Sequence, residues 1–588
     1  METPAKRPPK RREDRIILQF DYDCFYAQVF ENKHPHLKGK PLGVRQKNIL
    51  ATCNYHARAK GVKKLMLVTE ARRVCPALVL VDGEDLSPFR DVSKTLYRFL
   101  RSHSWSGKVE RLGFDEVFMD VTDVVDYNLS CLARGSLARS FFQLSRSDPE
   151  AGFACDLGAV AGPVLGGGGQ QRCVDPEDVS MVRLALGSHL AMHLRGRIER
   201  EFGYTSTCGV ATNKLLSKLC GGKNKPRNQT TLLARTDDDV LAFMDGHLLR
   251  DVPGVGFKTA HLIETAVTGV DKDDAADSHT FRSTVTVGEA RLHPAVSPAA
   301  LEKLLAGPGA ERGVGARIWA LLHGVDATEV KAGTDVPSQL SIEDTYRGLE
   351  TVARITEELF KLSCSLVRRM RVDLTTTSGG SRGAQRWLAR PRTLRLSIRS
   401  WPGRAQEGGG RGGGGGFPSR VSRSAAVPRF LLDLDADVEA VAERLVAEAL
   451  LPLLRRLGEA EAGGGSLWNL QLINVCVANM AAGAEGEDGE GGGGRYGAGR
   501  DIADMWKRQD EVLRPWKVVE DEEEGDEEGQ MGRKRGREVE EDQVDVFDDG
   551  LDVDGSWRGV MGDECRICGL AIPAFAATAH LRYHEMHK

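Results

Sequence analysis

Acidic residues follow two strand-like runs that lie about 90 residues apart in the chain. Asp21 comes directly after the apolar run Arg15 to Phe20, and Asp115 and Glu116 lie in the hairpin-like segment Arg111 to Asp120. If the two strands pair, the three carboxylates converge at one edge of a sheet. Carboxylate oxygens suit Mg²⁺, and two such ions can stabilise the attacking and leaving oxygens of a phosphoryl transfer. On spacing alone, ordinary turn residues are the commoner explanation, because Asp is frequent in turns.

A short basic segment, CNYHARAKGVKK, contains Tyr55, Arg58 and Lys64. A guanidinium binds phosphate as a planar fork and an ammonium as a point charge, and a tyrosine hydroxyl can donate to the same oxygens. The set therefore suits a triphosphate. The alternative is an ordinary basic helix face.

The segment Leu249 to Lys258, LRDVPGVGFK, lies between two helical patterns and is typical of the hairpin in a helix-hairpin-helix motif. Gly254 and Gly256 would let the backbone approach a phosphate, and the N–H groups at the start of the next helix, near Lys258, could bind it. Such contacts would position DNA without reading its sequence. A plain turn between helices is the alternative.

An arginine-rich stretch runs from Arg368 to Arg399 and contains nine Arg and a single acid, Asp373. Within it, TLRLSIR alternates apolar and polar residues, which places Arg395 and Arg399 on one face of a predicted strand. A cationic strand face suits the backbone of a duplex. A solvated charged face is the alternative.

Four residues near the end of the chain have the spacing of metal ligands: Cys565, Cys568, His580 and His584. The two His are four residues apart, on one face of a predicted helix, and the set predicts tetrahedral structural Zn²⁺ in a small ββα finger. An island of fewer than 30 residues needs such a metal to fold.

Composition and charge divide the 588-residue chain. Apolar residues make up 41% and charged residues 28%, which excludes a wholly disordered chain. No run of about 18 apolar residues occurs, so neither a transmembrane helix nor a membrane partner is expected. Residues 520–549 carry 15 acidic and 4 basic residues. Because the whole chain has a net charge of −4, the remainder is basic and suits an anionic partner.

These observations predict an α+β multidomain chain. The expected parts are a disordered basic tail (1–14), an α/β body (15–235) with an insertion at about 130–175, a region of short helices (236–332), a helix-and-strand region with Gly-rich insertions (333–482), an acidic disordered linker (483–560) and the zinc finger (561–588). A long helical pattern covers Tyr346 to Arg369.

Four motifs resemble the Y-family translesion DNA polymerases: DYDCFYAQVF, CNYHARAKGVKKLM, PALVLVDGEDL and RLGFDEVFMD. The residues of these motifs are most similar to those of the iota subfamily, and the resemblance covers about residues 15–480. It implies a right-hand architecture of palm, fingers (about 43–93), thumb (236–332) and little finger (333–482). It also implies that Asp21, Asp115, Glu116 and the backbone carbonyl of Tyr22 hold two Mg²⁺, or Mn²⁺, ions.

The same resemblance implies the nucleotide site. The incoming dNTP would meet Tyr55, Arg58, Lys64 and Lys225, and Tyr26 would be a steric gate against ribonucleotides. Gln46 and Ile49 would overhang the templating base, with ordinary core packing as the alternative. Primer–template DNA is the implied partner.

The terminal finger resembles the ubiquitin-binding finger of the eta subfamily, but Arg582 stands where that finger has an acidic residue. The resemblance implies ubiquitin or a ubiquitinated sliding clamp as a further partner, and Arg582 makes zinc binding the firmer of the two expectations. The basic cluster Lys6 to Arg12 is typical of a nuclear localisation signal. The expected function is a nuclear, low-fidelity translesion DNA polymerase. The alternatives are an eta-like polymerase, a non-catalytic scaffold that binds DNA and ubiquitin, and a nucleotidyl cyclase.

Overall fold

The computed structural model describes residues 9–12, 14–166, 173–269, 283–307, 311–334, 336–377, 385–401, 420–461 and 468–482. The predicted zinc ligands, the acidic run 520–549 and most of the basic tail lie outside these residues. In the described part of the chain, no helix is long and apolar enough to cross a membrane.

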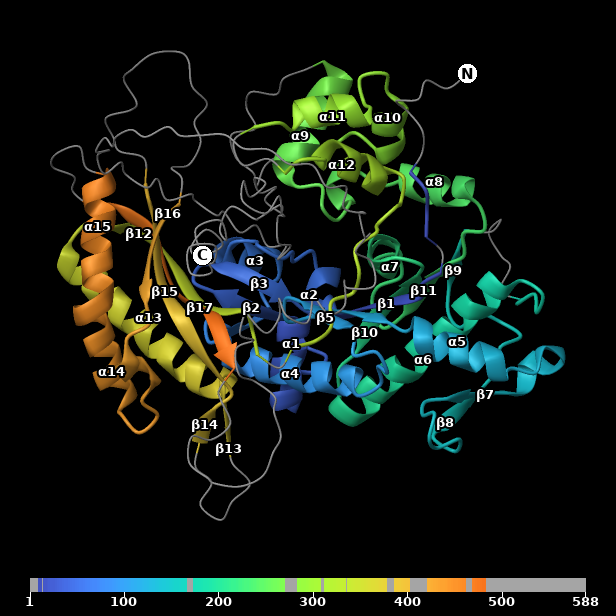
Figure 1. Cartoon of the computed structure of the whole chain (residues 1–588), viewed down its shortest axis with the longest axis horizontal. Helices are drawn as coiled ribbons and strands as arrows, with labels where there is room; N and C mark the ends of the chain where they lie inside the picture. The colour runs from blue at the N-terminus through green and yellow to red at the C-terminus, as the bar shows by residue number, and fades with distance from the viewer. Residues whose placement is uncertain are drawn as a thin grey trace, which may run out of the picture. The chain divides into compact units, whose positions relative to one another are not determined.

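A six-stranded mixed sheet forms the centre of the first half of the chain (Figure 1). Its order is β5 (Val109–Leu112), β6 (Glu116–Asp120), β1 (Ile17–Tyr22), β10 (Ser206–Ala211), β11 (Gln229–Leu232) and β9 (Val164–Leu165). β1 is antiparallel to both of its neighbours, whereas β10, β11 and β9 are parallel. The expected pairing of the two strands that carry the acidic residues is therefore present.

The two faces of strand β1 differ in polarity, because successive side chains of a strand point to opposite sides. Leu18, Phe20 and Tyr22 join the largest hydrophobic core. The opposite face carries Gln19 and Asp21, and this face meets helix α7 (Lys214–Gly221). The core side is covered by helices that include α6 (Val179–Phe202), α5 (Thr122–Cys131), α4 (Ser87–Arg101) and α1 (Phe25–Lys33).

Helix α7 packs unusually close to the sheet because two glycines meet there. A Cβ on Gly209 of β10 would lie 1.8 Å from the carbonyl oxygen of Ser217, and one on Gly221 would lie 2.9 Å from the backbone nitrogen of Gly209. Asn213 caps the helix by accepting a hydrogen bond from the Leu216 N–H at 2.8 Å. The helix is thereby fixed above the acidic end of β1.

A second, three-stranded sheet has the order β3 (Ile49–Cys53), β2 (Leu42–Gln46) and β4 (Val79–Asp82). Helices α2 (Tyr55–Ala59) and α3 (Val68–Val74) belong to this region, which has its own small core around Leu50, Val62 and Ala71. The short helical turn η2 (Pro35–Leu37) leads into it from α1.

The predicted insertion at about 130–175 contains ordered structure. It includes the helical turn η3 (Arg134–Arg139), the hairpin β7 (Ser140–Gln143) and β8 (Gly152–Cys155), and the edge strand β9 of the central sheet. Phe153 stacks on His193 of α6 with ring centroids 4.0 Å apart, and Arg146 lies over the Trp105 ring at 4.6 Å. These contacts fasten the segment to the main body.

Residues after β11 form short helices around a third core, with Trp319 among its buried members. They are α8 (Asp237–Asp245), η4 (Leu249–Asp251), α9 (Phe257–Thr268), α10 (Val287–Leu292), α11 (Pro298–Leu304) and α12 (Val314–Leu322). Buried Glu264 of α9 accepts hydrogen bonds from the Ser283 hydroxyl at 2.7 Å and the Val285 N–H at 2.9 Å, which ties the helices together.

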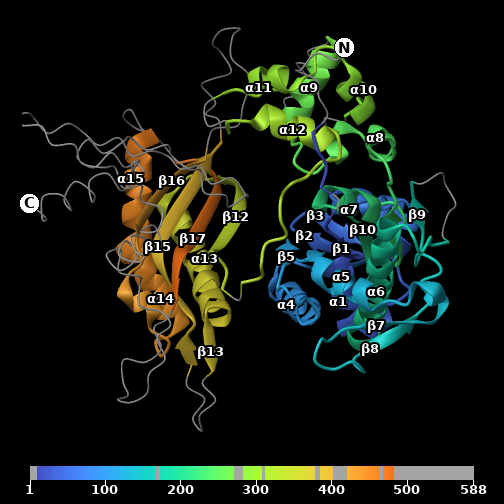
Figure 2. The same cartoon turned by 45° about the vertical axis from the view of Figure 1, so that its right-hand side comes forward.

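The last described region is a four-stranded antiparallel sheet of order β12 (Gln339–Leu349), β17 (Leu470–Ala482), β15 (Ala389–Ser400) and β16 (Val421–Ala426). Helices α13 (Val352–Asp373), α14 (Val438–Leu445) and α15 (Leu451–Glu461) share its core, and α14 and α15 follow one another beside the sheet (Figure 2). The remaining elements are the hairpin β13 (Thr375–Thr377) and β14 (Gln385–Trp387), the turn η6 (Arg429–Leu432) and the π-helical turn η7 (Val446–Leu450).

The helix predicted from Tyr346 begins later, at Val352, because Thr351 caps it. Tyr346 lies in β12, whose pairing with β17 outweighs the helical pattern of the sequence.

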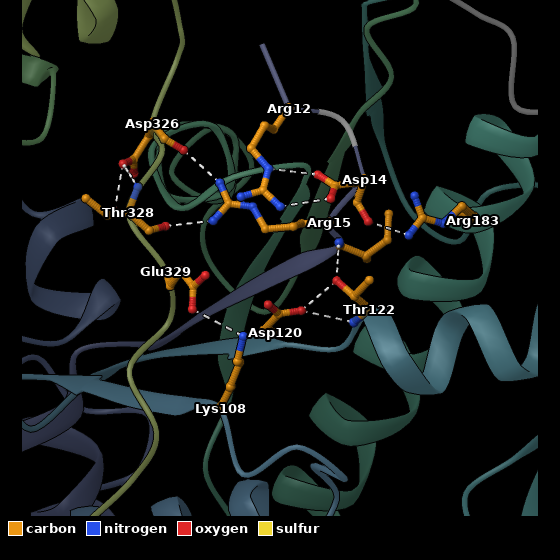
Figure 3. Close-up of polar contacts among 11 residues, drawn as sticks. Arg12, Asp14, Arg15, Lys108, Asp120, Thr122, Arg183, Asp326, Thr328 and Glu329 are labelled. Carbon is orange, nitrogen blue, oxygen red and sulfur yellow. Dashed lines mark hydrogen bonds and ion pairs between the residues drawn. The ribbon is translucent and has the colours of Figure 1, made fainter. Parts of the chain in front are cut away.

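The segment 325–333, which we call the connecting segment, joins the short helices to this last sheet and runs along the central sheet. Arg15 donates hydrogen bonds to the backbone carbonyls of Asp326 and Thr328, both at 2.7 Å, and Lys108 pairs with Glu329 at 3.3 Å (Figure 3). Val330 is buried against Ile17 and Phe118. The connecting segment is therefore attached to the central sheet over most of its length.

Candidate active site

Three predicted carboxylates meet at the end of strand β1. Asp21 lies directly opposite Glu116 in the register of β1 and β6. Asp115 immediately precedes β6, and its backbone carbonyl accepts a hydrogen bond from the Tyr22 N–H at 2.9 Å. Directly opposed residues of an antiparallel pair project from the same face. The two acidic segments of the sequence therefore form one acidic edge.

Two lysines neutralise part of this edge. Lys225 Nζ lies 2.5 Å from Asp21 Oδ2, and Lys218 Nζ lies 2.6 Å from Glu116 Oε2. The pKa of Asp115 is raised to about 6, first because its carboxylate is poorly hydrated and then because Asp21 and Glu116 repel its charge. Within the described ranges, no three acidic, His or Cys side chains are gathered closely enough to hold a metal ion. Lysine ammoniums occupy the positions beside two of the three carboxylates.

The donor set nevertheless fits hard divalent cations. Its groups are carboxylates and one adjacent backbone carbonyl, the oxygen ligands that Mg²⁺ and Mn²⁺ take. Burial, and then repulsion from Asp21 and Glu116, raises the pKa of Asp115, and a bound divalent cation would favour its ionised form.

Sequence reasoning gave Asp23 no role, but the structure makes it a positioning residue. Its side chain is 3% exposed and accepts hydrogen bonds from the Thr205 hydroxyl at 3.0 Å and the Arg227 N–H at 2.9 Å. Burial is the main reason that its pKa is raised. These bonds fasten the loop that carries Lys225 to the end of β1.

Tyr26, the predicted steric gate, lies in the first turn of α1. Its ring stacks on Phe89, with centroids 4.0 Å apart and an interplanar angle of 12°, and Phe114 lies 6.4 Å away. The stack holds the ring in one orientation beside the segment that contains Asp115.

Tyr55 and Arg58 come together at the start of α2. The Arg58 guanidinium lies over the Tyr55 ring at 4.8 Å and donates from Nε to the Cys53 carbonyl at 3.2 Å. Burial, then the negative charge of Asp23, raises the pKa of Tyr55 to about 12, so its hydroxyl remains a donor at neutral pH. Tyr55 and Asp23 are among the residues that line a cavity of about 480 Å³, whereas Arg58, Lys64 and Lys225 do not line it. Lys64 lies in an exposed turn after α2.

Gln46 and Ile49 form a directly opposed pair across β2 and β3. The Gln46 amide donates to the Gly83 carbonyl at 2.9 Å, which fixes its orientation, and Ile49 is 37% exposed. Both are therefore on one face of the small sheet, and Ile49 presents apolar surface to solvent.

The predicted DNA contacts lie on two separate elements. Gly254 has φ +88°, and Gly256 is the N-cap of α9, whose second residue is exposed Lys258. In β15, Arg395 and Arg399 project from the face opposite the core, as the alternation predicts, and Arg395 Nε contacts the Ser424 hydroxyl at 3.3 Å. Asp373, the only acid of the arginine-rich stretch, pairs with Arg369 at 3.3 Å and also with Lys94.

Comparison with known proteins shows which family a part of the chain is similar to. Residues 20–222 match the model of the impB/mucB/samB family, and this match includes all three carboxylates of the acidic edge. Residues 20–222 therefore carry a domain that is similar to this family.

Individual relatives extend the similarity. The chain is 31% identical over 475 residues to DNA polymerase iota of Homo sapiens, covering 81% of this chain and 53% of that protein. It is 38% identical over 269 residues to DNA polymerase iota of Drosophila melanogaster (46% of this chain, 33% of that protein) and 32% identical over 251 residues to DNA polymerase eta of the same species (38% and 28%). The chain spans about half the length of the human relative.

Proposed function

We propose that this protein is a DNA-directed DNA polymerase of translesion synthesis, most similar to the iota subfamily. It would join the α-phosphate of a dNTP to the 3′-hydroxyl of a primer and release pyrophosphate. The observation that carries the proposal is the register of β1 and β6, which sets Asp21 opposite Glu116 with Asp115 beside them.

Asp21 and Asp115 would each contact two divalent cations, with the Tyr22 carbonyl as a further ligand and Glu116 completing the site near the attacking hydroxyl. When bound, the ions supply electrostatic stabilisation of the attacking and leaving oxygens. Asp23 keeps the Lys225 loop in place while this happens, because its two hydrogen bonds do not involve the acidic edge.

The remaining groups select and hold the nucleotide. Tyr55, Arg58, Lys64 and Lys225 would neutralise the triphosphate and then the departing pyrophosphate. The Tyr26 ring, supported by its stacking partner, would leave no room for a 2′-hydroxyl.

The templating base would meet Gln46 and Ile49, whose bulk favours a narrow, iota-like site. Gly254, Gly256, Lys258, Arg395 and Arg399 would hold the DNA backbone.

The rest of the chain suggests where and with what the enzyme acts. The basic cluster Lys6 to Arg12 supports a nuclear protein. The spacing of Cys565, Cys568, His580 and His584 supports a zinc finger. Its resemblance to the eta-subfamily finger, from which Arg582 departs, supports ubiquitin or a ubiquitinated clamp as the partner. A scaffold without catalysis would have no need of the acidic edge, and a cyclase would have no use for an arginine face on a second sheet.

Single-nucleotide primer extension opposite each template base tests the function. Wild type is compared with Asp115→Ala and Glu116→Ala, and with Glu70→Ala as a control, since Glu70 is exposed on α3. We expect extension by wild type and the control but none by the two site variants, with their melting temperatures unchanged. Efficient insertion opposite A and poor insertion opposite T would indicate an iota-like site, whereas even use of all four bases would indicate an eta-like one. Normal extension by Asp115→Ala would contradict the assignment, and a wild type that binds DNA without extending it would favour the scaffold.

A further inference from the structure

Helix α7 carries two lysines one turn apart, and they meet carboxylates of different kinds. Lys214 Nζ contacts both oxygens of Glu110 at 3.0 and 2.9 Å, and Lys218 Nζ contacts Glu116 at 2.6 Å. Glu110 lies in β5, outside the acidic edge, and also accepts a hydrogen bond from the Lys331 N–H at 2.9 Å. Lys214 is therefore part of a fixed structural contact, whereas Lys218 contacts a proposed catalytic group.

The two lysines also differ in how much of each side chain is exposed to solvent. The Lys218 side chain is 30% exposed and that of Lys214 is 16% exposed. The backbone beneath both lysines cannot follow a moving ammonium, because α7 is capped by Asn213 and is in close contact with β10 at Gly209. If Lys218 leaves Glu116, it must do so by changing its rotamer, and any new partner must lie within the reach of one lysine side chain.

Electrostatics sets the condition for that exchange. A cation bound by Glu116 removes the attraction that holds the Lys218 ammonium and repels it at short range. Lys225 would make the corresponding change from Asp21 to the triphosphate under the proposed function. The Lys218 ammonium reaches Glu116, the first residue of β6. The proposed function places the attacking end of the primer near Glu116.

We propose that Lys218 is a conditional DNA contact: it pairs with Glu116 until a divalent cation occupies the acidic edge, and it then binds a phosphate of the primer strand. This inference rests on the proposed function and adds a residue to it. Lys218 then links cation binding to DNA binding. It competes with the cation for Glu116, and it can bind DNA only after the cation has displaced it. Linkage of this kind is reciprocal, so DNA strengthens cation binding by the same factor through the same residue.

Binding without chemistry tests the exchange. A primer–template with a dideoxy-terminated, fluorescent primer is titrated with wild type, Lys218→Ala, Lys218→Gln and the control Lys214→Ala, in EDTA and in Ca²⁺, by fluorescence anisotropy. In Ca²⁺ we expect both Lys218 variants to bind about tenfold more weakly than wild type, as for one lost charge-assisted phosphate contact, with a salt slope smaller by about 1. In EDTA we expect them to equal wild type. Lys214→Ala should respond to Ca²⁺ as wild type does.

A second measurement leaves DNA out. Mn²⁺ is titrated into each protein and free Mn²⁺ is followed by electron paramagnetic resonance. Lys218→Ala and Lys218→Gln should bind Mn²⁺ more tightly than wild type, because the competing ammonium is gone, and Lys214→Ala should not.

Three outcomes overturn the inference: an equal loss of DNA affinity in EDTA and Ca²⁺, no loss in either, or Mn²⁺ binding by the Lys218 variants that is no tighter than that of wild type. Primer extension by wild type is scored separately. If wild type does not extend a primer, the proposed function fails. The cation dependence of DNA binding still decides whether Lys218 changes its partner from Glu116 to a phosphate.

Discussion

At the acidic edge, lysine ammoniums lie beside two of the three carboxylates. Lys225 and Lys218 each pair with one carboxylate, and Asp115 is left with the raised pKa of a crowded acid. Under the proposed function, divalent cations would displace these ammoniums from the carboxylates. The chemistry of this edge should therefore depend strongly on pH.

Cation binding should weaken as the pH falls through about 6, the value to which burial raises the pKa of Asp115. Below that pH the neutral acid predominates and must lose its proton before it can bind a cation, whereas above it the carboxylate is already ionised. Mn²⁺ titrations between pH 5 and pH 8 measure the effect. Asp115→Asn should bind Mn²⁺ more weakly and lose most of this dependence. A flat profile for wild type would contradict the prediction.

Tyr26→Ala should allow ribonucleotides to be inserted. Removing the ring opens space for one hydroxyl, and a pocket of fixed size typically distinguishes one such group by about 10- to 100-fold. The measured quantity is the ratio of kcat/KM for dNTP and rNTP in primer extension. Phe89→Leu keeps Tyr26 but removes its stacking partner, so this variant should show a smaller loss of discrimination. An unchanged ratio in Tyr26→Ala would exclude the gate.

At the scale of single elements, the position of α7 decides which carboxylates its lysines reach. The contact depends on Gly209, where any side chain would collide with the backbone of the helix. Strand β10 and helix α7 are joined by a short turn, so neither can shift alone.

Gly209→Ala should lower the free energy of unfolding by at least about 1–3 kcal/mol, the usual cost of forcing extra volume into a packed interior. Thermal unfolding followed by circular dichroism measures the loss. Gly246→Ala is a matched control, because a Cβ there meets nothing within 4 Å. Equal stability of the two variants would show that α7 can move away from the sheet at little cost.

The sequence predicted the strands of the acidic edge and the alternation in β15, because both follow from local patterns of apolar and polar residues. Lys218 could not be found that way. In KLLSKLCG it is indistinguishable from any polar helix position, and its contact with Glu116 joins residues 102 apart. Asp23 was missed for the same reason, since its partners Thr205 and Arg227 come from distant segments. The predicted helix start at Tyr346 was wrong, because strand pairing with β17 outweighed the helical pattern of the sequence there.

At the scale of the whole described chain, the connecting segment links three regions of the protein. It follows the short helices, crosses the central sheet and leads into the last sheet. Besides the contacts of Arg15 and Val330, the Gly333 N–H donates to the Gly107 carbonyl at 3.1 Å. A Cβ on Gly333 would lie 1.8 Å from the Tyr97 hydroxyl oxygen.

Gly333→Ala should therefore loosen the end of the connecting segment. Hydrogen–deuterium exchange should speed up at the Lys331 and Gly333 amides, which donate to Glu110 and Gly107. Combining the change with Tyr97→Phe removes the colliding hydroxyl and should restore part of the protection. Gly135→Ala is the control, because no atom lies within 4 Å of its new Cβ. Protection equal to wild type in Gly333→Ala alone would contradict the prediction.

Attachment of the connecting segment also limits how far the arginine face of β15 can travel. A free chain from Gly324 to the start of β12 at Gln339 could span about 50 Å at about 3.4 Å per residue, but only about 20 Å remain once the chain is held as far as Gly333. On chain length alone, the volume that the last sheet could reach is then roughly fifteen times smaller. If two surfaces hold one DNA, as the proposed function has it, a shorter tether gives a higher effective concentration of the second surface, and so tighter binding without any additional contact.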